Sequence, residues 1–430
     1  MKPSPVSEAS MKRFIGVAVL AIPLVLLASP RRAGAQEEIK IGVILPLTGA
    51  AAGTGVELKN ASELAAEIVN TDMKDLPLPL AAGAGLPGLK GAKIRLVFAD
   101  HQGSPQVGAS EAERLITQEH VVALTGCYFS AVTATASQVA ERHGIPFLNS
   151  DSTSSTLTER GFRWFFRTTP ADDLFVKNFF QFLKDVQAKK GVQVKKLALF
   201  NENTLWGSET TKLEDRLGKE QGYTVAETVL YPAKSTQLTS EVQRIAAAGA
   251  DVVMQSSYLG DAVLAMRTYR DLGYTPTALL ANDAGFNDTE FLKSVGKDGD
   301  DILSREVWAL DLGDKKPLIR RVNDLLQARY HVNFTGNSAR DFTGILTLAD
   351  AIDRAGSTDP EAIRKALAAT SVPGDRLIMP WDGIRFDAKG QNELGTGIIV
   401  QVQKGKYATV WPFKLATADI VWPMVPWSKR

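Results

Sequence analysis

The stretches IKIGVILPLTG at residues 39–49 and NASELAAEIV at 60–69 contain the two patterns that repeat along this chain. Residues 39–45 are largely apolar and β-branched, which is typical of a buried strand. Ala61, Leu64, Ala65 and Ile68 then follow at the i, i+3, i+4, i+7 spacing of one helix face. A strand followed by an amphipathic helix is the unit from which helix-covered parallel sheets are built.

The same unit recurs to the end of the chain. Strands are predicted at 94–98, 121–125, 145–148, 197–200, 225–230, 252–254 and 278–280, and helices at 104–116, from 130, at 172–189, 207–221, 237–248 and through 262–269. Helices at 316–330, 340–355 and 360–369 lead into short strands between 383 and 412, and the Gly-, Ala-, Pro- and Leu-rich segment 76–91 is predicted to be a surface loop. Two doubly wound parallel α/β lobes are therefore expected.

The amino terminus has the pattern of an export signal. Lys12 and Arg13 precede an apolar run at 14–28, which is shorter than the roughly 20 residues of a transmembrane helix. Ala33-Gly-Ala35 supplies the small residues of a cleavage site, so we expect a signal peptide at 1–35, cleavage after Ala35 and a periplasmic chain of 36–430 without a membrane anchor. Translation can start at Met1 or at Met11.

Composition excludes several classes of function. Lys and Arg total 49 against 48 Asp and Glu, so there is no basic excess for nucleic acid. The four histidines show no metal spacing, and the G-x-G-x-x-G match at 83–88 precedes a strand where a nucleotide loop would follow one, so neither a metal nor a cofactor is expected. Cys127 is the only cysteine; a thiol–imidazole pair with His101 or His143 is the enzymatic alternative to a non-catalytic protein.

Four segments carry a family resemblance: IKIGVILPLTG at 39–49, LTERG at 157–161 with FRT at 166–168, WG at 206–207, and AGSTDPE at 355–361. In this order they resemble the branched-chain amino-acid-binding (Leu/Ile/Val-type) substrate-binding proteins of ABC transporters. The resemblance implies a type I periplasmic-binding fold that crosses a three-segment hinge near 171, 306 and 392. Lobe 1 would then comprise 36–171 and 307–392, and lobe 2 would comprise 172–306 and 393–430.

The resemblance also implies a function. The chain would be a monomeric, non-catalytic receptor that closes on a small polar solute, an amino acid or related amine or amide, and delivers it to an inner-membrane ABC permease. The alternative is a periplasmic sensor for amides or amino acids that feeds a signalling receptor.

Ligands of doubly wound sheets bind beyond the carboxyl ends of the strands. Ser130 stands at such a strand end, where the helix N-terminus would attract a solute carboxylate. The resemblance implies the same role for Ser130, backbone contacts for Thr153, aromatic walls for Trp206 and Tyr258, and pairing of Asp283 with a ligand ammonium. Ser130 as a simple N-cap and Asp283 as a turn residue are the structural alternatives.

Three departures from the family pattern concern the ligand. Trp206 replaces a tyrosine, and Asp151 replaces a small residue that contributes only its carbonyl, so Asp151 is a further candidate ligand contact. An extra acid would favour a cationic or amine-rich ligand, unless Asp151 caps a turn in its Ser- and Thr-rich loop. Gly103 and Phe129 occupy the positions of a cysteine pair found in some members.

Overall fold

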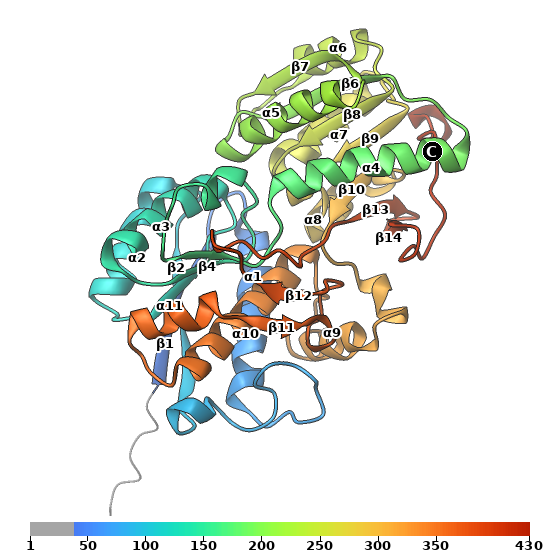
Figure 1. Ribbon diagram of the computed structural model, residues 1–430. Coiled ribbons are helices and arrows are strands. Elements are labelled where there is room, and N and C mark those ends of the chain that lie inside the picture. The colour runs from blue at the N-terminus through green and yellow to red at the C-terminus, as the bar shows by residue number, and fades with distance from the viewer. Residues whose placement is uncertain (1–37) are drawn as a thin grey trace, which may run out of the picture. The chain divides into compact units, whose positions relative to one another are not determined.

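The computed structural model describes residues 38–430 (Figure 1), so the predicted signal peptide lies outside the described residues. The first sheet is parallel, with the order β2-β1-β3-β4-β5. Its strands are β1 (Glu38–Leu45), β2 (Lys93–Asp100), β3 (Ala123–Gly126), β4 (Phe147–Asn149) and β5 (Phe165–Arg167). This is the doubly wound order expected for consecutive strand–helix units.

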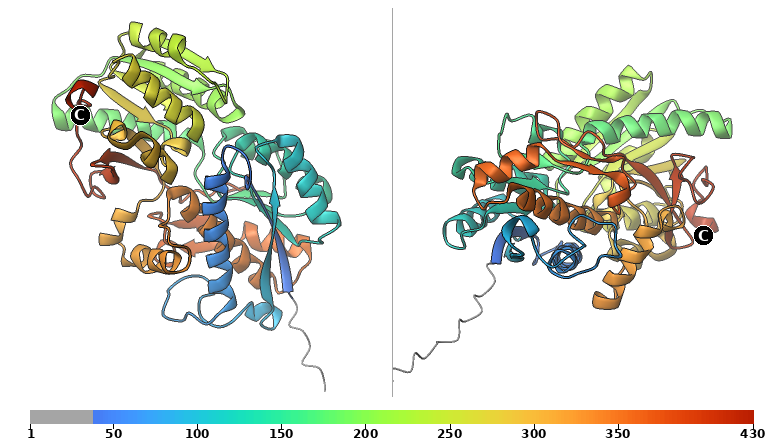
Figure 2. Two further views of the ribbon diagram at one scale, coloured as in Figure 1. Left: turned by 180° about the vertical axis from the view of Figure 1, so that it is seen from behind. Right: turned by 60° about the horizontal axis from the view of Figure 1, so that its bottom comes forward.

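Helices cover both faces of this sheet. They are α1 (Ala52–Asn70), α2 (Pro105–Thr117), α3 (Ser130–His143), α9 (Pro317–Tyr330), α10 (Gly336–Ala355) and α11 (Pro360–Ala368). Successive side chains of β1 point to opposite faces of the sheet, and each face has its own hydrophobic core. Ile41 and Val43 pack with α1 and α10, whereas Ile44 packs with α2 and α3. Helices α1 and α10 lie side by side in Figures 1 and 2 and contact each other along their lengths.

The second sheet has the order β14-β13-β10-β9-β8-β6-β7. Its strands are β6 (Lys196–Glu202), β7 (Thr224–Tyr231), β8 (Val252–Ser256), β9 (Ala278–Ala281), β10 (Leu303–Glu306), β13 (Ile398–Gln403) and β14 (Lys406–Trp411). Only β13 and β14 run antiparallel to their neighbours. Its helices are α4 (Asp172–Lys190), α5 (Leu205–Glu220), α6 (Thr239–Ala247), α7 (Leu259–Asp271) and α8 (Thr289–Val295), and they pack against its two faces in separate cores.

Shorter elements complete the chain. They are the strands β11 (Ser371–Pro373) and β12 (Gly383–Arg385) and the 3₁₀ turns η1 (Pro87–Leu89), η2 (Ser155–Thr158), η3 (Ala284–Phe286), η4 (Gly296–Gly299), η5 (Leu310–Asp314), η6 (Gly374–Arg376) and η7 (Trp427–Lys429). The α/β class with two parallel sheets is confirmed. Within residues 38–430, no helix is both long enough and apolar enough to cross a membrane.

The segment 76–91 is more ordered than the predicted surface loop. Leu78, Ala81 and Leu86 are buried in the core beneath α1 and α10. The Gly88 amide donates to the Asp353 carboxylate on α10 at 2.7 Å. Its leucines therefore fold the segment back onto the helices, because apolar side chains gain stability by leaving water.

The chain passes between the sheets at three places: between β5 and α4, after β10, and between β12 and β13. Two of these segments are bonded to each other. Arg167 Nε donates to Gln391 Oε1 at 2.6 Å, and Asn392 Nδ2 donates to the Thr168 carbonyl at 3.0 Å. These bonds hold the segments in register beside the cleft between the sheets.

Candidate functional cleft

All six residues predicted to bind the ligand line one small cavity. Its volume is about 20 Å³, and it is lined by Tyr128, Ser130, Asp151, Ser152, Thr153, Trp206, Tyr258, Asp283, Ala284, Arg305, Asn337 and Arg340. The contributing loops follow β3 and β4 of the first sheet and β6, β8 and β9 of the second. The candidates, which were chosen because they follow strand ends, therefore lie together and come from both lobes.

Ser130 is the first residue of α3, and Phe129 occupies the N-cap position without a side-chain cap bond. Ser130 is thus not a simple N-cap. Its backbone N–H bonds the hydroxyl of Tyr258, which comes from the other lobe. The position predicted for a solute carboxylate is therefore held here by a phenolic oxygen.

The loop after β4 is organised by Asn149. Its Nδ2 donates to the Ser152 carbonyl at 2.7 Å, and its Oδ1 accepts from the Ser152 amide at 3.0 Å. Thr153 then meets the first residue of α4: its carbonyl accepts from the Asp172 amide at 2.9 Å, and its hydroxyl bonds the Asp172 carboxylate. Asp172 is fully buried at this junction.

Aromatic side chains form one wall of the cavity. The Tyr258 ring centroid lies 5.0 Å from that of Trp206 and 5.7 Å from that of Tyr128. Trp206 is buried at the start of α5, and its indole Nε1 has no hydrogen-bond partner among residues 38–430. A buried N–H without a partner costs free energy, which a ligand acceptor would recover.

Asp283 is already ion-paired. Its Oδ2 lies 2.6 Å from Arg305 Nη1 and 2.9 Å from Arg340 Nη2, and its Oδ1 accepts from Asn287 Nδ2 at 3.1 Å. Burial alone would raise the pKa of Asp283, but the two guanidinium groups lower it below its ordinary value. Asp283 also has φ +56°, and η3 begins at the next residue, so it does lie in a tight turn.

Asp151 is also engaged. Arg340 Nε lies 3.0 Å from Asp151 Oδ1, and the Asp341 carboxyl, which accepts from the Ser150 hydroxyl, lies close to Asp151. Burial and the neighbouring Asp341 raise the pKa of Asp151 well above its ordinary value. The raised pKa favours the neutral, protonated form of Asp151, and the Arg340 guanidinium opposes any negative charge that this carboxyl carries.

Arg305 and Arg340 were not predicted as site residues, although both are at most 2% exposed. Arg305 is the third of the four residues of the buried strand β10, and its guanidinium carbon lies 3.8 Å from the centre of the Phe175 ring. Arg340 lies in the first turns of α10, beside Asn337. The signal available for Arg305 was a charged residue directly beside the predicted hinge crossing near 306.

A larger cavity of about 370 Å³ adjoins the first and shares Tyr128, Trp206 and Tyr258 with it. Much of its lining is apolar, with Ala51, Phe129 and Val132 from the first lobe and Leu259 from the second. Glu202 and Asp261 lie on its second-lobe side, and burial and Asp261 raise the pKa of Glu202 well above its ordinary value. We call the small cavity the inner pocket and this one the outer chamber.

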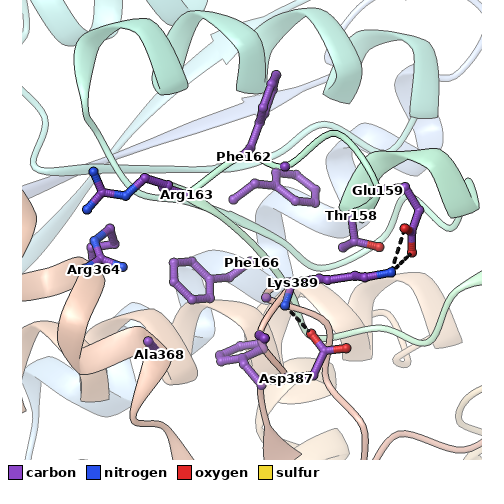
Figure 3. A pocket seen from close by; sticks show the side chains of 14 residues that line it. Thr158, Glu159, Phe162, Arg163, Phe166, Arg364, Ala368, Asp387 and Lys389 are labelled. Carbon is purple, nitrogen blue, oxygen red and sulfur yellow. Dashed lines mark hydrogen bonds and ion pairs between the residues drawn. The ribbon is translucent and has the colours of Figure 1, made fainter.

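Figure 3 shows a third cavity, about 490 Å³, between the segments 158–166 and 386–390 of the first lobe. Phe162 and Phe166 lie between a pair of arginines at one end and Lys389 at the other. Lys389 Nζ pairs with Glu159 at 2.7 Å, and Arg364 pairs with Glu361 at 2.7 Å. None of the six predicted residues lines it, so we do not place the solute there.

The enzymatic alternative gains no support from the geometry. His101 Nε2 contacts the Cys127 carbonyl at 2.9 Å, and His143 pairs with Glu113 at 2.8 Å. Burial raises the pKa of the Cys127 thiol far above its ordinary value, which disfavours the nucleophilic thiolate. Among the described residues, no cluster of three His, Cys, Asp or Glu side chains could hold a metal ion.

Comparisons with known proteins agree with this architecture. The family model described as periplasmic binding protein matches residues 38–406. A Leu/Ile/Val-binding protein homolog 7 from Brucella suis is 29% identical over 401 residues, which cover 91% of this chain and 96% of that protein.

Solved structures show the same fold. The leucine-binding protein LivK of Thermotoga maritima is 21% identical with a TM-score of 0.74, covering 86% of this chain and 97% of that one. LivJ of Streptococcus pneumoniae, in complex with isoleucine, is 21% identical with a TM-score of 0.71, covering 90% and 100%. The resemblance recognised from the four motifs is thereby confirmed, and the chain belongs to the periplasmic binding protein family, with the type I fold of its branched-chain amino-acid-binding members.

Proposed function

We propose that this protein is the substrate-binding component of an ABC uptake transporter and binds a small polar solute, an amino acid or related amine or amide, between its two lobes. The observation that carries the proposal is the inner pocket, where residues from five strand-end loops of both sheets meet. The isoleucine in the complex of the Streptococcus relative supports an amino-acid-like solute.

Binding by hinge closure follows from the cross-cleft contacts. Thr54 Oγ1 on α1 donates to Asp288 Oδ2 at 2.5 Å, and Thr156 Oγ1 donates to Glu209 Oε1 at 2.8 Å. A solute that touches both lobes would add contacts that exist only when the lobes meet, and so would shift the population toward the closed form. We propose lobes of 36–171 with 307–392 and of 172–306 with 393–430.

The remaining parts of the proposal follow from family membership. A periplasmic location after removal of residues 1–35, action as a monomer and delivery of the solute to an inner-membrane permease are what such a receptor requires. The residues assigned to the solute are Ser130, Asp151, Thr153, Trp206, Tyr258 and Asp283, all of which line the inner pocket.

The test is a thermal-shift screen of the 36–430 chain against amino acids, amines, amides and small carboxylates. A solute at about 100 times its Kd stabilises a protein that binds it only when folded by about 2.7 kcal/mol, which is easily measured. We expect at least one solute of these classes to raise the melting temperature.

The matched pair of variants is Trp206→Ala and Trp164→Ala. Trp164 is half-buried and lines neither the inner pocket nor the outer chamber, so its removal tests general loss of stability. We expect the shift to vanish in Trp206→Ala and to persist in Trp164→Ala. A solute shift that survives Trp206→Ala undiminished would place the site elsewhere.

A further inference from the structure

The inner pocket has no free carboxylate for a ligand ammonium. Asp283 Oδ2 contacts the guanidinium groups of Arg305 and Arg340 at 2.6 and 2.9 Å. An ammonium approaching this carboxylate would meet the two guanidinium groups that already pair with it. The second acid, Asp151, faces the Arg340 guanidinium at 3.0 Å, so a buried positive charge opposes an ammonium there as well.

Three donors and the two Asp151 oxygens that line the pocket have no hydrogen-bond partner among residues 38–430; Arg340 Nε and Asp151 form an ion pair with each other, which leaves two donors without any partner. Trp206 Nε1 and Asn337 Nδ2 are buried and find no hydrogen-bond partner within the described part of the chain. Both residues line the inner pocket, one from each lobe. Buried donors of this kind are satisfied by an oxygen acceptor, and an ammonium has none to offer.

The sizes of the two cavities indicate that they hold different parts of one ligand. The inner pocket, at about 20 Å³, holds a group about as large as a single water molecule. The outer chamber, at about 370 Å³, has room for the body of a small solute and is walled by apolar side chains and aromatic rings. Tyr128, Trp206 and Tyr258 line both cavities, so a single ligand can extend from one to the other.

We infer that the solute is recognised through an oxygen-acceptor head, a carboxylate or amide carbonyl, held at Trp206 and Asn337, and through an apolar body in the outer chamber, and that an ammonium group is not required. This inference rests on the proposed function and narrows its solute class. The oxygen-acceptor head accepts hydrogen bonds from Trp206 and Asn337, and the apolar body packs against the aromatic wall. Asp283 stays ion-paired with Arg305 and Arg340.

The experiment uses two series of probes that differ only in the head. Leucine is compared with 4-methylpentanoate, which lacks the amino group, and with 3-methylbutylamine, which lacks the carboxylate. Phenylalanine is compared in the same way with 3-phenylpropanoate and 2-phenylethylamine. Titration calorimetry on the 36–430 chain at pH 7 gives each Kd.

We expect the deamino acid to bind within about threefold of the amino acid, or more tightly, and the amine to bind at least about 30-fold more weakly. An amino acid that binds more than about tenfold more tightly than its deamino acid would overturn the inference while leaving the proposed function intact. If no probe of either series binds, the inference is wrong, and the wider solute screen decides the proposed function separately.

A second measurement tests the donor. Trp206→Phe keeps an aromatic ring at the wall and removes the indole N–H together with the five-membered ring, so Kd for the carboxylate should rise about tenfold. Trp308→Phe is the matched control, because Trp308 is also buried with an unpartnered Nε1 among residues 38–430 but packs against Phe334 in the first-lobe core. An unchanged Kd in Trp206→Phe would overturn the role of Nε1.

Discussion

Substitution Asp283→Asn tests whether this carboxylate serves the fold or the ligand. The side chain keeps its shape, and asparagine tolerates the φ of +56°, so the change removes little except the negative charge. Among residues 38–430, the ion-pair partner left to Arg305 is Asp172, at 3.8 Å, and the one left to Arg340 is Asp151, whose pKa burial raises well above its ordinary value. Two buried guanidinium groups thus lose their common counter-ion.

Removing one partner of a buried ion pair costs about 3–5 kcal/mol, because it leaves an uncompensated charge in a medium of low dielectric constant. The total stability of a folded protein is only about 5–15 kcal/mol. We therefore expect the urea midpoint of Asp283→Asn at pH 7 to fall clearly below that of the wild type. The exposed acid Asp271, which pairs with Arg270 at the surface, provides the control, and Asp271→Asn should leave the midpoint nearly unchanged.

The double variant Asp283→Asn with Arg340→Met separates charge from packing. Removal of one guanidinium should recover part of the lost stability, because less positive charge then remains unpaired. If Asp283→Asn instead costs less than about 1 kcal/mol and abolishes binding of an amino acid, the carboxylate is a free ammonium site, and our account of the ion-pair network is wrong.

Two further groups give predictions. Burial and the nearby Asp288 raise the pKa of Glu57 to about 7, so its protonated form stabilises the fold fully below its ordinary pKa of 4.5, and this contribution is lost as the pH rises to about 7. The unfolding free energy of the wild type relative to Glu57→Gln should therefore fall by about 3 kcal/mol as the pH rises from 4.5 to 7, and a pH-independent difference would contradict the shift. Cys127 is fully buried with a raised thiol pKa, so a thiol reagent at pH 8 should label it only after unfolding in urea, whereas rapid labelling of the native chain would contradict its burial.

Periodicity predicted the fold because each lobe is built from local strand–helix units. The strand predicted at 39–45 is β1 (Glu38–Leu45), and the helix predicted at 172–189 is α4 (Asp172–Lys190). Ala61, Leu64, Ala65 and Ile68 are all buried, as their spacing indicates. Such patterns depend on neighbours within a few residues, so the sequence displays them directly.

Helix α10 shows where local patterns were insufficient. We predicted a start at 340, but the helix begins at Gly336, because Thr335 and Ser338 form a reciprocal capping box. Gly336 and Asn337 are weak helix formers, so the sequence pattern did not indicate a helix start at Gly336. The missed turn contains Asn337, and it leads directly into Arg340, so two polar residues of the inner pocket were not recognised.

The arginine network also changes what the departures from the family pattern mean. An extra acid at Asp151 suggested a cationic ligand when it was considered alone. In the structure it faces Arg340 and Asp341, about 190 residues away in sequence: the guanidinium opposes its negative charge, and burial and Asp341 raise its pKa. The role of a residue carried over from a family depends on the partners that surround it, and these come from α10 and β10, which no motif covered. Arg305 and Arg340 neutralise Asp283, so recognition shifts from the ammonium end of an amino acid toward its carboxylate end and its apolar side chain.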